Sequence, residues 1–187
     1  MQKRQKKALA PSLRTGRPVK RKPGRPATAG RDVIRLPVRV RYPETDPMGY
    51  LHHSVHLVYF EMARTELLRR HGISYADLEK EGFLLAVAKA DVEYLAPAYY
   101  DDLLLVEARL KSAGFVRLVH EYKIWRKFER GDHKKSKGEG ARTDEVPSKA
   151  KGWVLIARGK STLACLDREG RLQRLPEIIT RLFKKKK

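Results

Sequence analysis

The run from Val55 to Arg70 constrains the fold of this chain more than any other feature. Its first half is almost entirely apolar, its second half is charged, and His71-Gly72 follows as a typical helix C-terminal signal. The length favours a helix over a strand, and the apolar residues on every side predict that this helix is buried nearly all round. In a chain of 187 residues, burial of this kind requires a layer that surrounds the helix. We therefore expect a sheet wrapped round one long helix.

The segments after this helix can supply such a sheet. A short second helix is expected over residues 73–80, and the hydrophobic period then changes to that of strands. Runs rich in Val, Leu, Tyr and Trp predict four antiparallel strands over residues 83–95, 102–112, 115–128 and 153–166. Residues 33–42 predict a first strand before the helix, and residues 176–183 predict a terminal helix that begins at a proline. This order of elements indicates the α+β class.

The net charge of +20 is concentrated outside the expected core. Residues 1–30 hold ten Lys or Arg and no acid, residues 184–187 add four Lys, and residues 127–151 carry eight bases against five acids. The rest of the chain is nearly neutral, which argues against an evenly basic nucleic-acid-binding domain. We expect a disordered basic tail over 1–31, a folded domain over 32–183 with a charged hairpin insertion over 127–151, and a basic C-terminal tail over 184–187.

The N-terminal tail contains Gly-Arg-Pro twice with basic flanks, and it resembles an AT-hook that enters the A·T minor groove. The match is imperfect, because Thr15 and Pro23 stand where the hook usually has Arg. Three readings remain open: specific minor-groove binding, nonspecific attraction to nucleic acid or an anionic membrane, and a solvated tail without a partner.

The cysteine count and the hydropathy pattern restrict the classes of protein and of site that the chain can form. The single cysteine, Cys165, excludes an intramolecular disulfide and a multi-cysteine metal site. It lies in an apolar, strand-like run, so we interpret it as a small buried hydrophobe and not as a nucleophile. No stretch of about 18 apolar residues is present, so no membrane-spanning helix is expected. Together these features favour a cytoplasmic protein.

The stretch from Tyr42 to His53 carries the most specific candidate chemistry. It places Asp46 in a loop broken by Pro and Gly, between the first strand and the long helix. The first backbone N–H groups of a helix have no intrahelical partner and can polarise a carbonyl oxygen. An acid held beside such amides is sufficient apparatus for acyl transfer. Taken alone, an Asp in a loop with Pro and Gly is more often an ordinary turn residue than a catalytic one.

Several common active-site patterns are absent from the sequence. It has no nucleophile elbow, no phosphate-binding Gly-Lys-Ser/Thr loop and no dinucleotide fingerprint after a strand. His52, His53 and His56 suggest zinc, but no further His and no suitable Cys stands at metal-ligand spacing. We therefore expect neither a metal nor a cofactor.

Motifs spread over residues 38–176, interrupted by the 127–151 insertion, add a family resemblance. In order, they are Tyr42-x-x-Thr45-Asp46-x-x-Gly49-x-x-x-His53, Glu61-x-Ala63-Arg64-x-Glu66-x-Leu68-Arg69, Val92-Glu93-Tyr94-x-x-Pro97-Ala98-x-x-Asp101-Asp102, Leu166-Asp167 and Gly170-Arg171-x-x-Arg174-Leu175-Pro176. The sequence resembles the 4-hydroxybenzoyl-CoA thioesterase family of hotdog-fold acyl-CoA thioesterases, in particular its bacterial Tol–Pal-associated branch.

The resemblance implies a hotdog fold and the hydrolysis of acyl-CoA to a carboxylic acid and CoA. Asp46 occupies the position of the family's nucleophile or general base. His53 falls where a backbone N–H at the start of the helix polarises the carbonyl. Gly49 would let the loop approach the thioester closely, since glycine lacks a Cβ atom. A site this sparse suits a thioester, because a thiolate is a good leaving group.

The resemblance also implies substrate-binding positions. His56 stands where the family usually has Tyr, which leaves the preferred acyl chain length open. Lys89, in the strand after the helix, would contact the CoA phosphates together with Arg171 or Arg174. The implied substrate-binding residues are Tyr42, Thr45, His56, Lys89, Arg171 and Arg174.

Glu61 is a secondary catalytic candidate, because some related hotdog enzymes use a helix Glu as the catalytic acid. It lies in the apolar half of the helix, where we expect it to be buried, and a buried acid needs a partner. Arg64 stands three residues later, so a structural ion pair between the two is the competing interpretation.

The resemblance further implies a homodimer or a dimer of dimers, with each active site at the dimer interface. Two alternatives remain: a thioesterase acting on acyl carrier protein, and a non-catalytic hotdog binding module with a DNA-binding basic tail. Neither the acyl group nor the choice between covalent and direct water attack follows from the sequence.

Overall fold

The computed structural model describes residues 33–128 and 152–183. Five strands form one antiparallel sheet in the order β1-β3-β4-β5-β2. They are β1 (Val33–Arg39), β2 (Leu84–Tyr94), β3 (Leu103–Ala113), β4 (Arg117–Lys127) and β5 (Trp153–Leu166). The helices are the one-turn 3₁₀ helix η1 (Tyr42–Glu44), α1 (Val55–Arg70), α2 (Tyr75–Lys80) and α3 (Glu177–Phe183). The predicted α+β class is confirmed.

The first strand is shorter than predicted. It ends at Arg39, and the chain then enters η1, where Pro43 has no backbone N–H to donate to a sheet. The backbone N–H of Arg41 and its guanidinium group both donate to the Glu44 carboxylate, which stabilises the turn in place of a strand.

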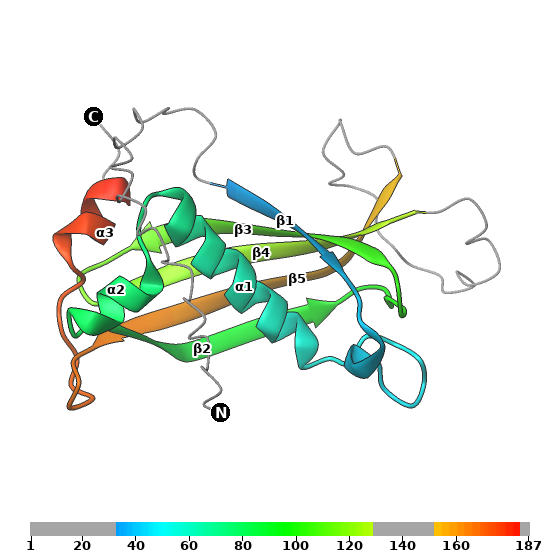
Figure 1. The fold of residues 1–187 in the computed structure, drawn as a ribbon, viewed down its shortest axis with the longest axis horizontal. Coiled ribbons are helices and arrows are strands. Elements are labelled where there is room, and N and C mark those ends of the chain that lie inside the picture. Colours follow the sequence, from blue (N-terminus) through cyan, green and yellow to red (C-terminus); the bar gives the residue numbers. More distant parts are fainter. Residues whose placement is uncertain (1–32, 129–151, 184–187) are drawn as a thin grey trace, which may run out of the picture.

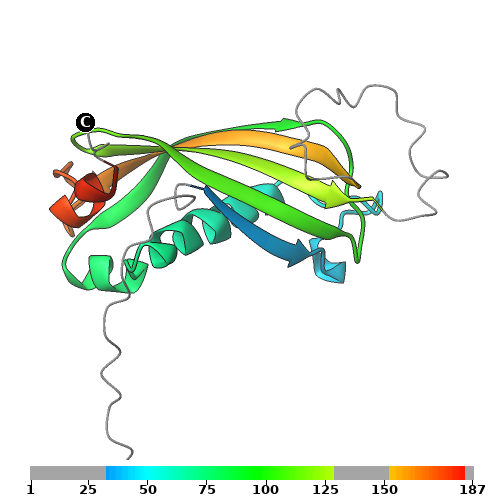
Figure 2. The ribbon, with the colours of Figure 1, turned by 90° about the horizontal axis from the view of Figure 1, so that it is seen from above.

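The curved sheet covers one side of α1, as Figures 1 and 2 show. The buried side of α1 carries His56, Tyr59, Phe60, Ala63, Leu67 and Leu68. The expectation that this helix is buried nearly all round is wrong for the single chain. Leu57, Val58 and Met62 are 42%, 51% and 43% exposed on the other side, because no element of the described chain covers it.

The core beneath α1 is closely packed where Phe60 meets β4 and β5. The Phe60 ring stacks on Tyr122 with centroids 4.2 Å apart and planes 10° apart. Gly159 of β5 lies directly under Phe60, and an added Cβ atom there would be 2.4 Å from Phe60 Cε2. Only glycine permits this approach of helix and sheet. Cys165 is fully buried in the same sheet, as predicted.

Strand β2 is an edge of the sheet, and its middle is open. The exposed run from residue 86 to residue 91 contains Ala86, Ala88 and Ala90, which are small enough for another strand to approach. Edge strands present unpaired backbone N–H and C=O groups. The fold therefore leaves this strand able to pair with another chain.

The predicted tails over 1–31 and 184–187 lie outside the described residues, as does nearly all of the predicted insertion over 127–151. The chain on either side of the insertion is described. Lys127 pairs with Trp153, and the Phe128 N–H donates to the Gly152 carbonyl at 2.6 Å, so β4 and β5 form an antiparallel pair at this point.

Candidate active site

The loop that carries Asp46 is closed by its own hydrogen bonds. The Asp46 N–H donates to the Tyr50 carbonyl at 2.8 Å, and Thr45 pairs with Leu51. The Asp46 carboxylate turns back into the loop, where Oδ1 accepts the N–H groups of Met48 at 2.9 Å and Tyr50 at 3.1 Å. In the part of the chain that the structure describes, Oδ2 of Asp46 accepts no hydrogen bond. The loop therefore fixes the carboxyl group by one oxygen and leaves the other available.

Gly49 has a conformational role in this loop. Its φ of +78° lies in the left-handed region, and its N–H donates to the Asp46 carbonyl at 2.8 Å. An added Cβ atom would meet nothing within 4 Å, so the predicted close approach at this residue has no counterpart within the single chain. Glycine is needed here for its backbone angle.

The buried carboxylate of Glu44 anchors the loop to α1, a role that was not predicted from the sequence. It accepts hydrogen bonds from the Tyr59 hydroxyl at 2.7 Å, the Arg41 N–H at 2.8 Å and the Arg41 guanidinium at 2.7 Å. The Glu44 carbonyl also accepts the His52 N–H at 2.9 Å. Burial raises the pKa of Glu44, but the bonds from Arg41 and Tyr59 outweigh it and hold that pKa below its ordinary value.

This anchor gives the folded protein a specific acid sensitivity. Because the pKa of Glu44 is lower in the folded chain, its stabilisation is present above the ordinary carboxyl range and is lost as the pH falls through the folded value. We expect Glu44→Gln to cost about 1–3 kcal/mol of unfolding free energy at pH 7. Urea unfolding at pH 7 and at about pH 3, below the ordinary carboxyl range, should then show a smaller pH dependence for the variant than for the native protein.

The matched control for this experiment is Glu177→Gln on α3. Glu177 pairs with Arg181, but its side chain is exposed to solvent. We expect this control to follow the native pH dependence. An identical pH dependence in Glu44→Gln and native protein would contradict the anchor.

The start of α1 presents an unused backbone donor beside the Asp46 loop. Ser54 is the N-cap, but its side chain forms no capping bond and instead contacts His52 Nδ1 at 2.8 Å. The His53 carbonyl accepts the Tyr94 hydroxyl at 3.0 Å, whereas the His53 N–H forms no hydrogen bond within the described residues. Free amides at a helix N-terminus carry the positive end of the helix dipole.

Asp46, His53 and His56 line one cleft of about 380 Å³. Its other lining residues are Met48, Tyr50, Leu51, Tyr94, Leu95, Ala96, Pro97 and Ala98. The loop is held against this last segment, because the Leu51 N–H donates to the Ala98 carbonyl at 2.8 Å. The cleft therefore combines an acid, a helix N-terminus and mostly apolar walls.

His56 is a buried wall of the cleft, and its ring packs edge-on against Tyr94 at 4.9 Å. Burial lowers the pKa of His56, with the nearby His52 and His53 carbonyl groups opposing this effect. The ring is therefore neutral near pH 7. Its Nδ1 atom is buried without a well-formed hydrogen bond among the described residues.

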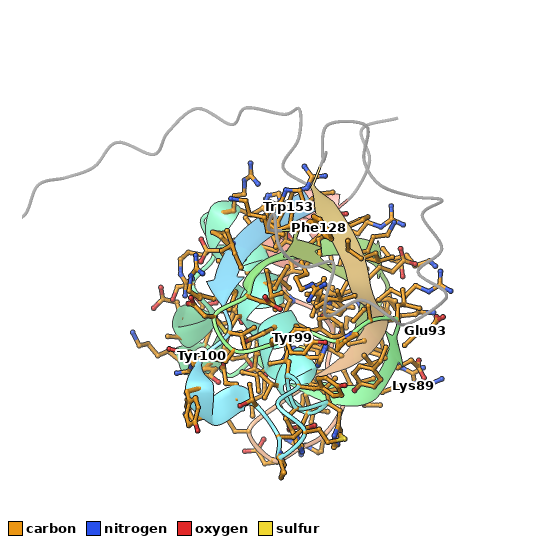
Figure 3. All side chains as sticks on the ribbon, turned by 90° about the vertical axis from the view of Figure 1, so that its right-hand side faces the viewer. Lys89, Glu93, Tyr99, Tyr100, Phe128 and Trp153 are labelled. Atoms are coloured by element: carbon orange, nitrogen blue, oxygen red, sulfur yellow. The ribbon has the colours of Figure 1, made fainter. Side chains whose placement is uncertain are left out.

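Other predicted substrate-binding residues lie outside this cleft in the single chain. Tyr42 is exposed and packs edge-on against Tyr100, and the Thr45 hydroxyl donates to the Tyr42 carbonyl at 2.9 Å. Lys89 projects from β2, 3.4 Å from Asp91 (Figure 3). The substrate contacts expected of these three residues stay predictions.

The segment between β5 and α3, to which Arg171 and Arg174 belong, lies at the opposite end of the sheet from the loop between β1 and α1 (Figure 1). Arg171 pairs with Asp167 and Glu169, and the Arg174 guanidinium lies 4.3 Å from the Phe115 ring centre. Neither arginine lines the Asp46 cleft of its own chain. Their predicted contact with CoA phosphates is untested.

Glu61 is not buried as expected, because its side chain is 65% exposed. It accepts a hydrogen bond from Arg64 at 2.7 Å, which confirms the predicted ion pair. Glu61 lies outside the Asp46 cleft of its own chain, on the same side of α1 as β2.

Over residues 33–128 and 152–183, no group of three or more His, Cys, Asp or Glu side chains is arranged to hold a metal ion. None of the helices in these same ranges is long and apolar enough to cross a membrane.

The chain shares its family with known thioesterases. Residues 48–130 match the thioesterase superfamily. The acyl-CoA thioester hydrolase YbgC of Escherichia coli is 39% identical over 92 residues, which cover 49% of this chain and 69% of YbgC.

Solved structures agree with this match. The hypothetical protein TT1821 of Thermus thermophilus has a TM-score of 0.61 and 32% identity, over 80% of this chain and 93% of that one. The DHNA-CoA thioesterase of Staphylococcus aureus shares the fold, with a TM-score of 0.60 and 24% identity over 80% and 90% of the two chains. The chain therefore belongs to the thioesterase superfamily, a family of thioester hydrolases, and has its α+β hotdog fold.

Proposed function

We propose that this protein hydrolyses acyl-CoA thioesters, with Asp46 as the nucleophile or general base and the His53 N–H as the donor that polarises the thioester carbonyl. One observation carries the proposal: Asp46, whose carboxylate is held by one oxygen, and His53, which directly precedes the N-cap of α1, line the same cleft. The acyl-CoA thioester hydrolase YbgC, a relative at 39% identity, supports the substrate class.

The thioester carbonyl oxygen accepts the His53 N–H, and the N-terminus of α1 stabilises the negative charge that develops on it. Asp46 then either attacks the carbonyl carbon through Oδ2 or removes a proton from a water molecule that attacks it. The C–S bond breaks, and the sulfur leaves as CoA thiolate, which takes up a proton. On the nucleophilic route, water hydrolyses the resulting anhydride. Both routes consume one water and yield a carboxylic acid and free CoA.

The loop hydrogen bonds give Asp46 its position in this scheme. The Met48 and Tyr50 N–H groups hold Oδ1 and so fix the orientation of the carboxylate before substrate binds. The reaction therefore carries no further entropic cost for orienting Oδ2. Glu44 fixes the loop to α1 and thereby sets the separation of Asp46 from the helix N-terminus.

The proposed assembly is a homodimer in which two β2 strands pair edge to edge, with a dimer of dimers as its possible extension. The open middle of β2 and the exposed Leu57, Val58 and Met62 on α1 support it. In such a pair, the end of one copy that holds Arg171 and Arg174 lies toward the Asp46 cleft of the other copy. These arginines and Lys89 are then candidates for the CoA phosphates.

Release of free thiol from a panel of aliphatic and aromatic acyl-CoAs tests the proposal. We expect turnover on at least one member, with slower release when the same acyl group is carried by acyl carrier protein. Faster release from the carrier would favour the carrier-protein thioesterase. Binding without turnover on every substrate would contradict the enzyme and favour a hotdog binding module.

A further inference from the structure

His56 is a polar side chain in the wall of the Asp46 cleft to which the proposed reaction assigns no role. It lies in the first turn of α1, is 4% exposed, and lines the cleft together with Asp46. Tyr94 packs edge-on against the His56 ring, with centroids 4.9 Å apart, so packing restricts the orientation of the imidazole. The other side chains that line the cleft are mostly apolar. A polar ring in such a wall can act on whatever the cleft holds.

The two ring nitrogens of His56 have different surroundings. Nδ1 is buried without a well-formed hydrogen bond, and the carbonyl groups of His52 and His53 lie near the ring. A proton on Nδ1 can face these oxygens, whereas a lone pair there would be repelled by them. Nε2 is then the unprotonated nitrogen. Within residues 33–128 and 152–183, Nε2 makes no hydrogen bond, yet it is not among the buried unpaired atoms. Its lone pair therefore reaches the open cleft.

A water molecule in this cleft has two hydrogen-bond acceptors available to it. Asp46 Oδ2 is one of them, because Met48 and Tyr50 hold only Oδ1. His56 Nε2 is the other. A water that donates one O–H to each acceptor has both hydrogens bound, and a lone pair of its oxygen remains for attack on a carbonyl carbon. Two acceptors and no donor thus orient the water as a nucleophile.

We propose that His56 Nε2 and Asp46 Oδ2 together hold the water molecule that attacks the thioester carbonyl. This inference rests on the proposed function and selects the direct route within it. The water oxygen bonds to the carbonyl carbon while Asp46 takes up a proton from it. The C–S bond then breaks, and the thiolate receives that proton from Asp46. His56 keeps its own proton on Nδ1 throughout, so it binds the water without titrating.

Thiol release in the first turnover, followed by rapid mixing, tests this assignment. His56→Phe keeps an aromatic ring against Tyr94 but removes the acceptor. We expect its kcat to be about thirtyfold lower, with the Kd of a CoA thioether within about twofold of the native value. The low rate should apply from the first turnover, because on the direct route water attacks before the thiol leaves. His56→Gln, whose amide oxygen can replace Nε2, should retain at least about a third of the native kcat.

The matched control is His71→Phe, because His71 is the C-cap at the other end of α1, and it should keep the native kcat. Melting temperatures establish that each variant is folded, and His56→Leu takes the place of His56→Phe if the latter does not fold. Native kcat in the variant without an acceptor would overturn the role of His56. A fast burst of one thiol per subunit before slow turnover would overturn it as well, since the thiol would then leave before water attacks. These two outcomes leave the proposed function intact, whereas a native protein without acyl-CoA turnover would overturn both.

Discussion

Asp46→Asn should reduce thiol release from acyl-CoA by at least about a hundredfold, with little change in the binding of a CoA thioether. The amide oxygen of Asn can still accept the Met48 and Tyr50 N–H groups that hold Asp46 Oδ1. The loop therefore keeps its shape. Asn carries an NH2 group in place of Oδ2, and this group can act neither as the nucleophile nor as the general base. Steady-state kinetics on the best substrate of the acyl-CoA panel measures the effect, which should appear in kcat.

The control for this prediction is Asp77→Asn on α2, which makes the same chemical change at an exposed carboxylate paired with Lys80. We expect native kcat in the control and similar melting temperatures for both variants. Retention of more than about half of the native kcat by Asp46→Asn would remove Asp46 from the reaction.

Gly159→Ala should destabilise the fold by about 3 kcal/mol, which corresponds to a fall of about 10 °C in melting temperature. The new Cβ atom would lie 2.4 Å from Phe60 Cε2 and 2.8 Å from the Asp91 carbonyl oxygen on the neighbouring strand. Neither group can retreat easily. Phe60 is stacked on Tyr122, and the Asp91 carbonyl belongs to the backbone of β2.

Gly114→Ala is the matched control for Gly159→Ala. A Cβ atom there would meet only the Arg117 carbonyl at 3.7 Å, an ordinary contact. Urea unfolding should place the control within about 0.5–1 kcal/mol of the native protein. Equal unfolding free energies for the two variants would show that Phe60 does not press on Gly159 as described.

The strands after α1 were predictable from runs rich in Val, Leu, Tyr and Trp, and α1 was predictable from the length of its apolar run and the His71-Gly72 stop. The burial of α1 was not predictable in the same way, since apolar residues on all sides of a helix do not reveal what covers each side. The sheet covers Tyr59 and Phe60, while Leu57 and Met62 remain exposed in the single chain. The sequence alone therefore does not distinguish the apolar residues that the chain's own sheet covers from those that the proposed dimer would cover.

Residues of the candidate site were predictable where their position depends on nearby sequence, and were missed where it depends on a residue distant in the chain. Asp46 and His53 were both placed from nearby sequence, because the loop and the start of the helix are adjacent in the chain. Glu44 was missed, since its burial depends on Tyr59, fifteen residues later, and a carboxylate in a polar turn gives no sign of this. The available signal was the position of Glu44 three residues after Arg41, a spacing at which a Glu side chain can accept the backbone N–H of the residue that precedes a helical turn.

A crystal structure of the Asp46→Asn variant with an uncleaved acyl-CoA bound would test the central claim most directly. We predict a thioester carbonyl oxygen about 2.7–3.1 Å from the His53 nitrogen, and the side chain of residue 46 about 3–3.5 Å from the carbonyl carbon. A thioester bound outside the cleft of Asp46 and His53, or with its carbonyl oxygen turned away from the start of α1, would contradict the account.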